Sequence, residues 1–190
     1  MVTVNLIGFM EFADRLKVAP AKIQNEVSQE VIEAGNDFVR RAKRDAPVDE
    51  GQLRAGISSL PIDKFTVEVV SAAFHSPFIE FGTRGKYQAQ EGIDASQFKG
   101  LKGQGGFYEF VIKILDWIKR KGIKAGVYSV KTHRRQGSKA AKFDEDYKLA
   151  SAIAFSILKK GIKPHPFFYK QRTVVKEKFT KRIQNIISSI

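Results

Sequence analysis

The sequence predicts an α+β fold, in which helices from both ends of the chain cover an antiparallel sheet of three to four strands. Three observations support this class. Apolar residues recur at helical spacing between residues 20 and 46, short stretches rich in Val and Thr lie between residues 53 and 81, and a second helical stripe closes the chain. With 190 residues, 43% of them hydrophobic, the chain can bury a sizeable core.

The first part of the chain predicts a strand followed by a long amphipathic helix. Residues 2–6 alternate and include β-branched residues, which favours a strand, and residues 9–17 favour a short helix. A longer helix follows from Pro20, since proline is well tolerated in a first helical turn. Its apolar stripe consists of Ile23, Val27, Val31, Ala34, Phe38 and Ala42. Pro47 disfavours helical geometry at the preceding residue and ends the helix.

The next segment predicts a three-stranded antiparallel meander. Residues 53–60 and 65–72 read as strands joined by a turn at 61–64, and residues 74–81 as a third strand. Pro77 falls within the third strand, which favours an edge position or a bulge. We expect this sheet to pack against the long helix.

The remaining chain predicts a helical insertion and a last helix. Residues 83–106 are polar and rich in glycine, residues 107–121 carry one apolar stripe, and residues 124–142 are basic without one acidic residue. A helix is expected over 144–160 because acidic residues suit a helix N-terminus. A terminal helix carries the stripe from Val175 to Ile190. We therefore expect a core domain of residues 1–83 and 161–190, and an insertion, residues 84–160, with two helices and two flexible basic loops.

Composition excludes several classes of site. No cysteine is present, so disulfides and thiolate metal sites are ruled out, and the three histidines lack paired ligand spacing. We therefore expect no metal and no cofactor. We also expect no contact with membranes, because no stretch approaches eighteen apolar residues. No secretory signal is evident, which predicts a protein that stays in the cytoplasm where it is made. The net charge of +13, which looks spread along the chain, favours polyanions or simply a solvated surface.

Two groups of residues are candidates for chemistry or for binding. Asp49 and Glu80 would form a hydrolase pair if they shared a pocket, but no nucleophile, nucleotide or phosphate-loop motif accompanies them, and no enzyme activity is expected. The basic segment 124–142 is the candidate nucleic-acid contact, and the alternative is a solvated loop. Its proposed contacts are Lys131, Arg134, Arg135 and Lys139. Trp117 would either stack on a base or pack in the core.

Several spaced motifs together resemble a known family. A helix ends before Ala46-Pro47-Val48-Asp49-x-Gly51-x-Leu53-Arg54, a strand pair is followed by Phe78-Ile79-Glu80-Phe81-Gly82-Thr83, and Lys163-Pro164-His165-Pro166-Phe167-Phe168 precedes the terminal helix. This order is similar to that of the neck and minor-tail family of long-tailed phages, typified by gene product ten of phage Hong Kong 97. We interpret the matching positions as fold-signature and interface residues: Pro47, Asp49, Gly51, Leu53, Arg54, Glu80, Phe81, Gly82, Thr83, Pro164, Pro166 and Phe167.

The resemblance implies a structural protein of a virion. It implies tail completion or head–tail joining at the neck of a phage or prophage, without enzyme activity. It also implies a ring-shaped homo-oligomer, expected to be a hexamer, between tail-tube or terminator proteins and head-connector proteins, with DNA only as passing cargo. Synthesis would take place in the bacterial host cytoplasm. The alternative hypothesis is a stand-alone nucleic-acid-binding protein that uses residues 124–142.

Overall fold

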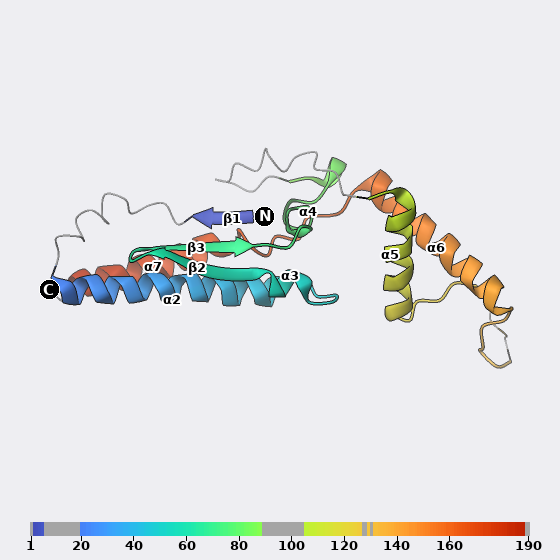
Figure 1. The fold of residues 1–190 in the computed structure, drawn as a ribbon, viewed down its shortest axis with the longest axis horizontal. Helices are drawn as coiled ribbons and strands as arrows, with labels where there is room; N and C mark the ends of the chain where they lie inside the picture. The colour runs from blue at the N-terminus through green and yellow to red at the C-terminus, as the bar shows by residue number, and fades with distance from the viewer. Residues whose placement is uncertain (1, 6–19, 89–104, 127–128, 130, 189–190) are drawn as a thin grey trace. The chain divides into compact units, whose positions relative to one another are not determined.

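The computed structural model describes residues 2–5, 20–88, 105–126, 129 and 131–188, so the helix predicted over 9–17 lies outside the described residues. The chain forms two compact units (Figure 1). Unit 1 comprises Met1–Gly82, Gln88–Phe98 and Lys163–Ile190, and unit 2 comprises Thr83–Tyr87 and Lys99–Ile162. Unit 1 therefore contains both ends of the chain, and unit 2 is made from the sequence between Gly82 and Lys163 apart from residues 88–98.

Unit 1 is organised around the predicted long helix, α2 (Ala21–Asp45). The helix follows Pro20 and ends at Ala46, whose extended conformation is the one that a following proline favours. Its buried residues recur at steps of three and four and form one stripe, which is the amphipathic face expected from the sequence: Val27, Val31, Ala34, Gly35, Phe38 and Ala42.

Among the described residues, the sheet of unit 1 contains three antiparallel strands in the order β1-β3-β2, which confirms the α+β class. The strands are β1 (Val2–Asn5), β2 (Ile57–Asp63) and β3 (Thr66–Ser71). Val69 of β3 lies opposite Val4 on one side and Ser59 on the other. Strand β3 is central, as the meander predicted over residues 53–81 expects for residues 65–72, but its second neighbour is β1 and not the strand predicted over residues 74–81.

The first part of the strand predicted over 53–60 and most of the strand predicted over 74–81 are helical, whereas residues 57–60 belong to β2 as predicted. Residues 53–56 fall in α3 (Gln52–Ala55) and the turn after it, and the segment predicted as the third strand contains α4 (Ser76–Phe81). Pro77 stands in the first turn of α4, where its missing N–H is not needed and its fixed φ suits a helix. Glu80 and Phe81 are both fully buried although they are adjacent, which a strand with one buried face would not allow.

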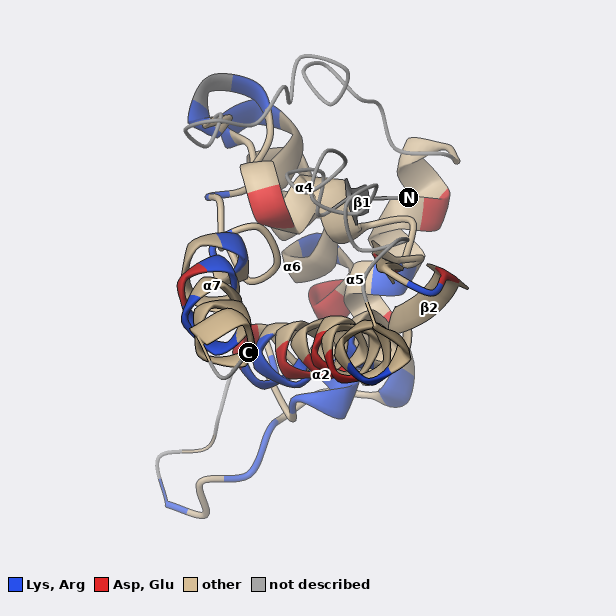
Figure 2. Cartoon of the chain, turned by 90° about the vertical axis from the view of Figure 1, so that its left-hand side faces the viewer, with Lys and Arg blue, Asp and Glu red and all other residues tan. Residues whose placement is uncertain are grey.

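Helix α2 lies close against one face of the sheet. A Cβ atom at Gly35 would come within 2.5 Å of Val67 Cγ1, so the absence of a side chain at Gly35 permits this approach. The second long helix of unit 1, α7 (Gln171–Ser188), lies beside α2 (Figure 1). Arg182 bridges the two helices through Glu30 at 3.1 Å and Glu33 at 3.3 Å. Figure 2 shows that basic and acidic residues both occur along α2.

Unit 2 is a pair of packed helices, α5 (Phe107–Arg120) and α6 (Lys139–Lys160), with the short η1 (Arg84–Lys86). Its apolar core is small and consists of Val111, Leu115, Ile118, Ala150 and Ala154. Helix α6 begins five residues before the predicted start at 144. Ser138 caps it by accepting the Ala141 N–H at 3.1 Å, and this capping, rather than the acidic cluster, sets the helix start.

Candidate functional site

The two proline-aromatic segments of the sequence, residues 76–83 and 163–168, meet in unit 1 at the carboxylate of Glu80. This side chain is fully buried, and its Oε2 accepts the backbone N–H groups of Phe167 at 2.9 Å and Phe168 at 3.0 Å. Its Oε1 accepts the N–H of Tyr169 at 3.0 Å. We call this arrangement the Glu80 latch. It satisfies three buried donors in the stretch that leads into α7, and a buried carboxylate is tolerated because both of its oxygens are hydrogen-bonded.

Further contacts hold the two segments together. The His165 N–H donates to the Ile79 carbonyl at 2.7 Å, next to the latch. Phe168 packs edge-to-face on Phe38 of α2, with ring centroids 5.0 Å apart, and Phe81 lies 5.6 Å from the ring of Tyr169. The latch therefore joins α4, residues 163–169 and α2 into one apolar cluster.

The polar edge of this cluster is made by Asp45 at the end of α2. Gln171 donates from Nε2 to Asp45 at 2.9 Å and also to the Phe167 carbonyl at 3.1 Å, and the Lys170 ammonium lies 2.9 Å from the same carboxylate. Hydrogen bonds from Arg44, Lys170 and Gln171 hold the pKa of Asp45 well below its usual range. The start of α7 is thereby tied to the end of α2.

Burial shapes the chemistry of Tyr169, which stands against the latch. Removal from water raises the pKa of its phenol to about 12, and the negative charge of Glu80 acts in the same direction. The phenol is therefore neutral at every physiological pH.

The predicted helix-to-sheet turn contains both buried and exposed signature residues. Leu53 is buried, whereas Pro47 and Asp49 are exposed, and Gly51 takes the left-handed φ of 82° at the start of α3. Arg54 reaches back to the carbonyls of Arg44 at 3.4 Å and Ala46 at 3.3 Å. It thus satisfies carbonyls that the end of α2 leaves without helical partners.

A pocket of about 350 Å³ opens beside this turn and is lined by residues 47–53 together with His75 and Ile79. Asp49 is among its lining residues and Glu80 is not, so the pocket does not bring together the carboxylate pair on which the hydrolase hypothesis depends. The described residues also contain no group of carboxylates and histidines arranged to hold a metal ion.

The remaining signature residues lie where the chain passes between the units. Gly82 is buried with φ 71°, and Pro164 and Pro166 are half-buried before the fully buried Phe167. Thr83 belongs to unit 2, where its N–H donates to the Ile162 carbonyl at 3.0 Å and its Oγ1 accepts the Ile162 N–H at 2.8 Å. These bonds close the base of the inserted unit.

The four proposed nucleic-acid contacts divide into two groups. Lys131, Arg134 and Lys139 are exposed. Arg135 instead lies against α6, where its guanidinium is 3.1 Å from Glu145 and 2.9 Å from Asp146, with 11% of its side chain exposed. Hydrogen bonding to Arg135 lowers the pKa of Asp146. Arg135 thus anchors the basic segment, and the other three side chains remain on its surface.

Trp117 is half-buried against the core of unit 2, which favours the packing alternative over base stacking.

The sequence did not indicate three members of the site around Glu80, namely Tyr169, Gln171 and Asp45. The direct continuation of Phe167-Phe168 into Tyr169 was a signal for the first of them, but no local pattern pointed to the contact between Gln171 and Asp45.

Comparison with known proteins gives a match to a family model. Residues 10–82 match the model of a family described as bacteriophage HK97-gp10, putative tail-component, which confirms the resemblance stated above for this part of the chain. Neither a curated protein nor a solved structure matches the chain. Among the described residues, no helix is long and apolar enough to cross a membrane.

Proposed function

We propose that the chain is a structural component of a phage tail that acts at the neck, where it completes the tail or joins it to the head. The family match carries this proposal, because it extends over α2, the β2–β3 hairpin and α4 up to Gly82. The Glu80 latch supports it further, since the signature residues of the two segments serve to hold the core together.

The subunit is proposed to form a closed ring, with a hexamer as the expected stoichiometry. A ring requires two different, complementary patches on each subunit. The pocket beside the α2–α3 turn is a suitable patch, because Val48 on its rim is 50% exposed and the nearby Phe74 is 55% exposed. The ring would lie between tail-tube or terminator proteins and head-connector proteins in the virion, after synthesis in the bacterial cytoplasm.

Assembly of the purified full-length chain tests this ring. We expect native mass spectrometry and negative-stain images over a range of concentrations to show closed rings for the wild type. Val48→Asp places a charge in the proposed contact, which should abolish the rings and leave a folded monomer. Val174→Asp on α7 is the matched control, because Val174 is also an exposed valine, at 39%, and should leave the rings intact.

A wild-type chain that stays monomeric at every concentration would remove self-assembly from the proposal. Loss of rings in both variants, with circular dichroism unchanged, would show that the pocket is not the specific contact. The stand-alone nucleic-acid-binding alternative predicts high DNA affinity from a chain that never assembles, so the same samples distinguish the two functions.

A further inference from the structure

The positive charge of the protein is concentrated in unit 2. Its residues 83–87 and 99–162 include 17 Lys and Arg and 5 Asp and Glu, a formal charge of +12. The whole chain carries +13, so unit 1 is close to neutral. The charge that looks evenly spread along the sequence is therefore carried almost entirely by the helical insertion.

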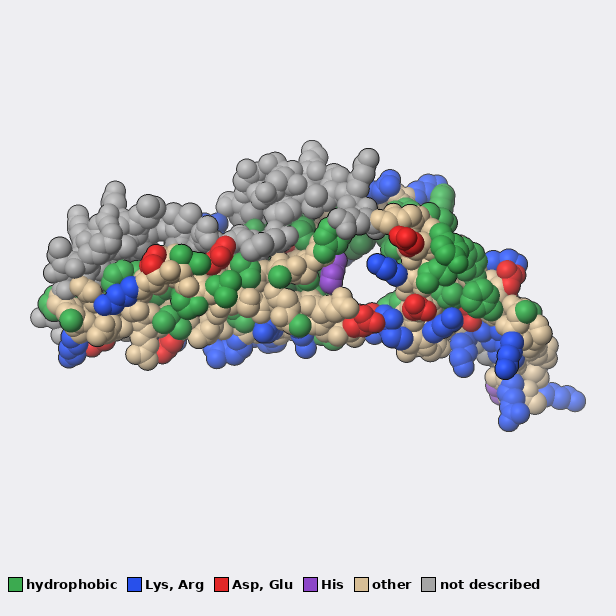
Figure 3. All heavy atoms as spheres, viewed as in Figure 1, with side chains coloured by type: hydrophobic (Ala, Val, Ile, Leu, Met, Phe, Trp, Pro, Cys, Tyr) green, Lys and Arg blue, Asp and Glu red, His purple; other side chains and the backbone are tan. Residues whose placement is uncertain are grey.

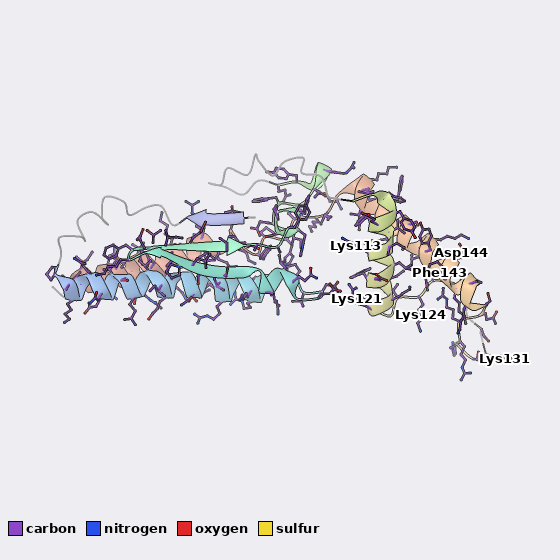
Figure 4. All side chains as sticks on the ribbon, viewed as in Figure 1. Lys113, Lys121, Lys124, Lys131, Phe143 and Asp144 are labelled. Atoms are coloured by element: carbon purple, nitrogen blue, oxygen red, sulfur yellow. The ribbon has the colours of Figure 1, made fainter. Side chains whose placement is uncertain are left out.

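Within unit 2 the charge gathers between the second half of α5 and the first turn of α6. Residues 117–143 contain nine Lys and Arg and no Asp or Glu. Figure 3 shows blue side chains around this part of unit 2, and Figure 4 shows Lys121 and Lys124 near the end of α5 and Lys131 at the far end of the loop. Seven of the nine are exposed: Lys119, Arg120, Lys121, Lys124, Lys131, Arg134 and Lys139.

The acidic residues that follow this segment hold it in place. Arg135 pairs with Glu145 and Asp146 and also donates to the Lys142 carbonyl at 2.7 Å. The Ala125 N–H donates to Asp146 at 3.3 Å. These contacts fasten Ala125 and Arg135 to α6, beside the exposed Lys124 and Arg134.

We propose that residues 117–143, which extend the basic segment 124–142 at both ends, bind the phosphate backbone of duplex DNA without reading its sequence. The basic segment denotes residues 117–143 from here on. Six of its nine cations are lysines, which act as point charges toward phosphates and are depleted from protein–protein interfaces. Its contact would be electrostatic and would weaken steeply with salt.

An anionic membrane fits the same segment less well. Binding in a membrane surface requires a helix with a broad apolar face free to enter the lipid. In unit 2 the residues Val111, Leu115, Ile118, Ala150 and Ala154 are buried between α5 and α6. Among the described residues of 117–143, Ile123 and Phe143 are the large hydrophobic side chains that stay exposed, and two such residues do not make a broad apolar face. The inference rests on unit 2 alone and stands whether or not unit 1 assembles into a ring.

A charge-neutralising triple variant of the full-length chain tests this inference. The test variant removes three exposed charges from the basic segment by Lys131→Gln, Arg134→Gln and Lys139→Gln. The control variant removes three exposed charges from unit 1 by Lys22→Gln, Lys176→Gln and Lys181→Gln. Affinity for a random-sequence duplex is measured by fluorescence anisotropy over a series of salt concentrations. We expect the first variant to lose about tenfold or more in affinity and to reduce the salt slope by up to about 3, and the control to change little.

Three outcomes would overturn the proposal: equal losses in the two triple variants, an affinity for duplex DNA that is independent of salt, or tighter binding to phosphatidylserine vesicles than to DNA. Circular dichroism of both variants checks that their helices are intact. Because the measurement does not involve assembly, its failure leaves the proposed tail role untouched, and a failure of ring formation leaves this test valid.

Discussion

Replacing Glu80 with glutamine is expected to lower the free energy of unfolding of unit 1 by about 3 kcal/mol or more. The carboxylate accepts three buried backbone N–H groups with its two oxygens, whereas a glutamine has one oxygen and turns an NH₂ group toward the remaining donors. Hydrogen bonds to a charged group contribute about 1.5–3 kcal/mol each, and an unsatisfied buried donor costs about 1–3 kcal/mol. The change of a few atoms therefore affects the whole latch.

Denaturant unfolding followed by circular dichroism measures this loss in the full-length chain. Glu177→Gln is the matched control, because Glu177 is exposed on α7 and the same substitution there should change stability by less than about 0.5 kcal/mol. Glu80→Asp should also destabilise, since the shorter side chain keeps the charge but cannot reach all three donors. If Glu80→Gln were as stable as Glu177→Gln, the latch would contribute nothing measurable to the fold.

Alkaline solution is expected to destabilise unit 1 through Tyr169. The folded-state pKa of about 12 lies above the value of about 10 for an exposed tyrosine. The stabilisation from keeping the phenol neutral is therefore complete below about pH 10 and is lost as the pH rises toward about 12. A difference of this size corresponds to about 2–3 kcal/mol, because each pKa unit is worth about 1.4 kcal/mol.

Ultraviolet titration of the phenolate measures this directly, with Tyr169→Phe supplying the difference spectrum. The wild type minus the variant should show one tyrosine that ionises late, near pH 12. The stability of Tyr169→Phe should also decline less than that of the wild type between about pH 10 and pH 12. A difference spectrum that titrates near pH 10 would place Tyr169 in water and contradict the burial described here.

Local patterns in the sequence were sufficient to locate α2 and α5. The stripes of α2 and α5 recur over many turns, so periodicity located these helices to within a residue or two of their observed ends. Pro20 and Pro47 flank α2 for steric reasons that act on neighbouring residues alone. Such rules need no knowledge of the rest of the fold.

Short elements and long-range contacts were harder to predict. The stretch around Pro77 is apolar and short, so its pattern does not distinguish a strand from a helix. Its helical form depends on the burial of Glu80 and Phe81 against residues 167–169, whose N–H donors lie more than eighty residues later in the sequence. The second neighbour of β3 is likewise distant in sequence, because it is β1 at the start of unit 1, and no local pattern indicated this pairing. Glu80 and Phe167 of the latch could be singled out from the sequence, but Tyr169 and the contact between the two segments could not.

The distribution of charge became clear only after the chain was divided into units. Basic residues occur in every part of the sequence, yet in unit 1 cations such as Lys170 and Arg182 pair with acidic residues of α2. The excess remains in the insertion. Assembly and DNA contact are thus proposed for separate parts of the chain.

The tail role is tested most directly by particles produced from a phage genome in which an early codon of the gene for this chain is replaced by a stop codon. Electron microscopy should show DNA-filled heads and tails that remain separate, and the wild-type chain supplied from a plasmid should restore joined virions. Cryo-electron microscopy of those virions should place the chain in a ring at the neck. Fully joined, infectious particles without the chain would contradict the proposed role.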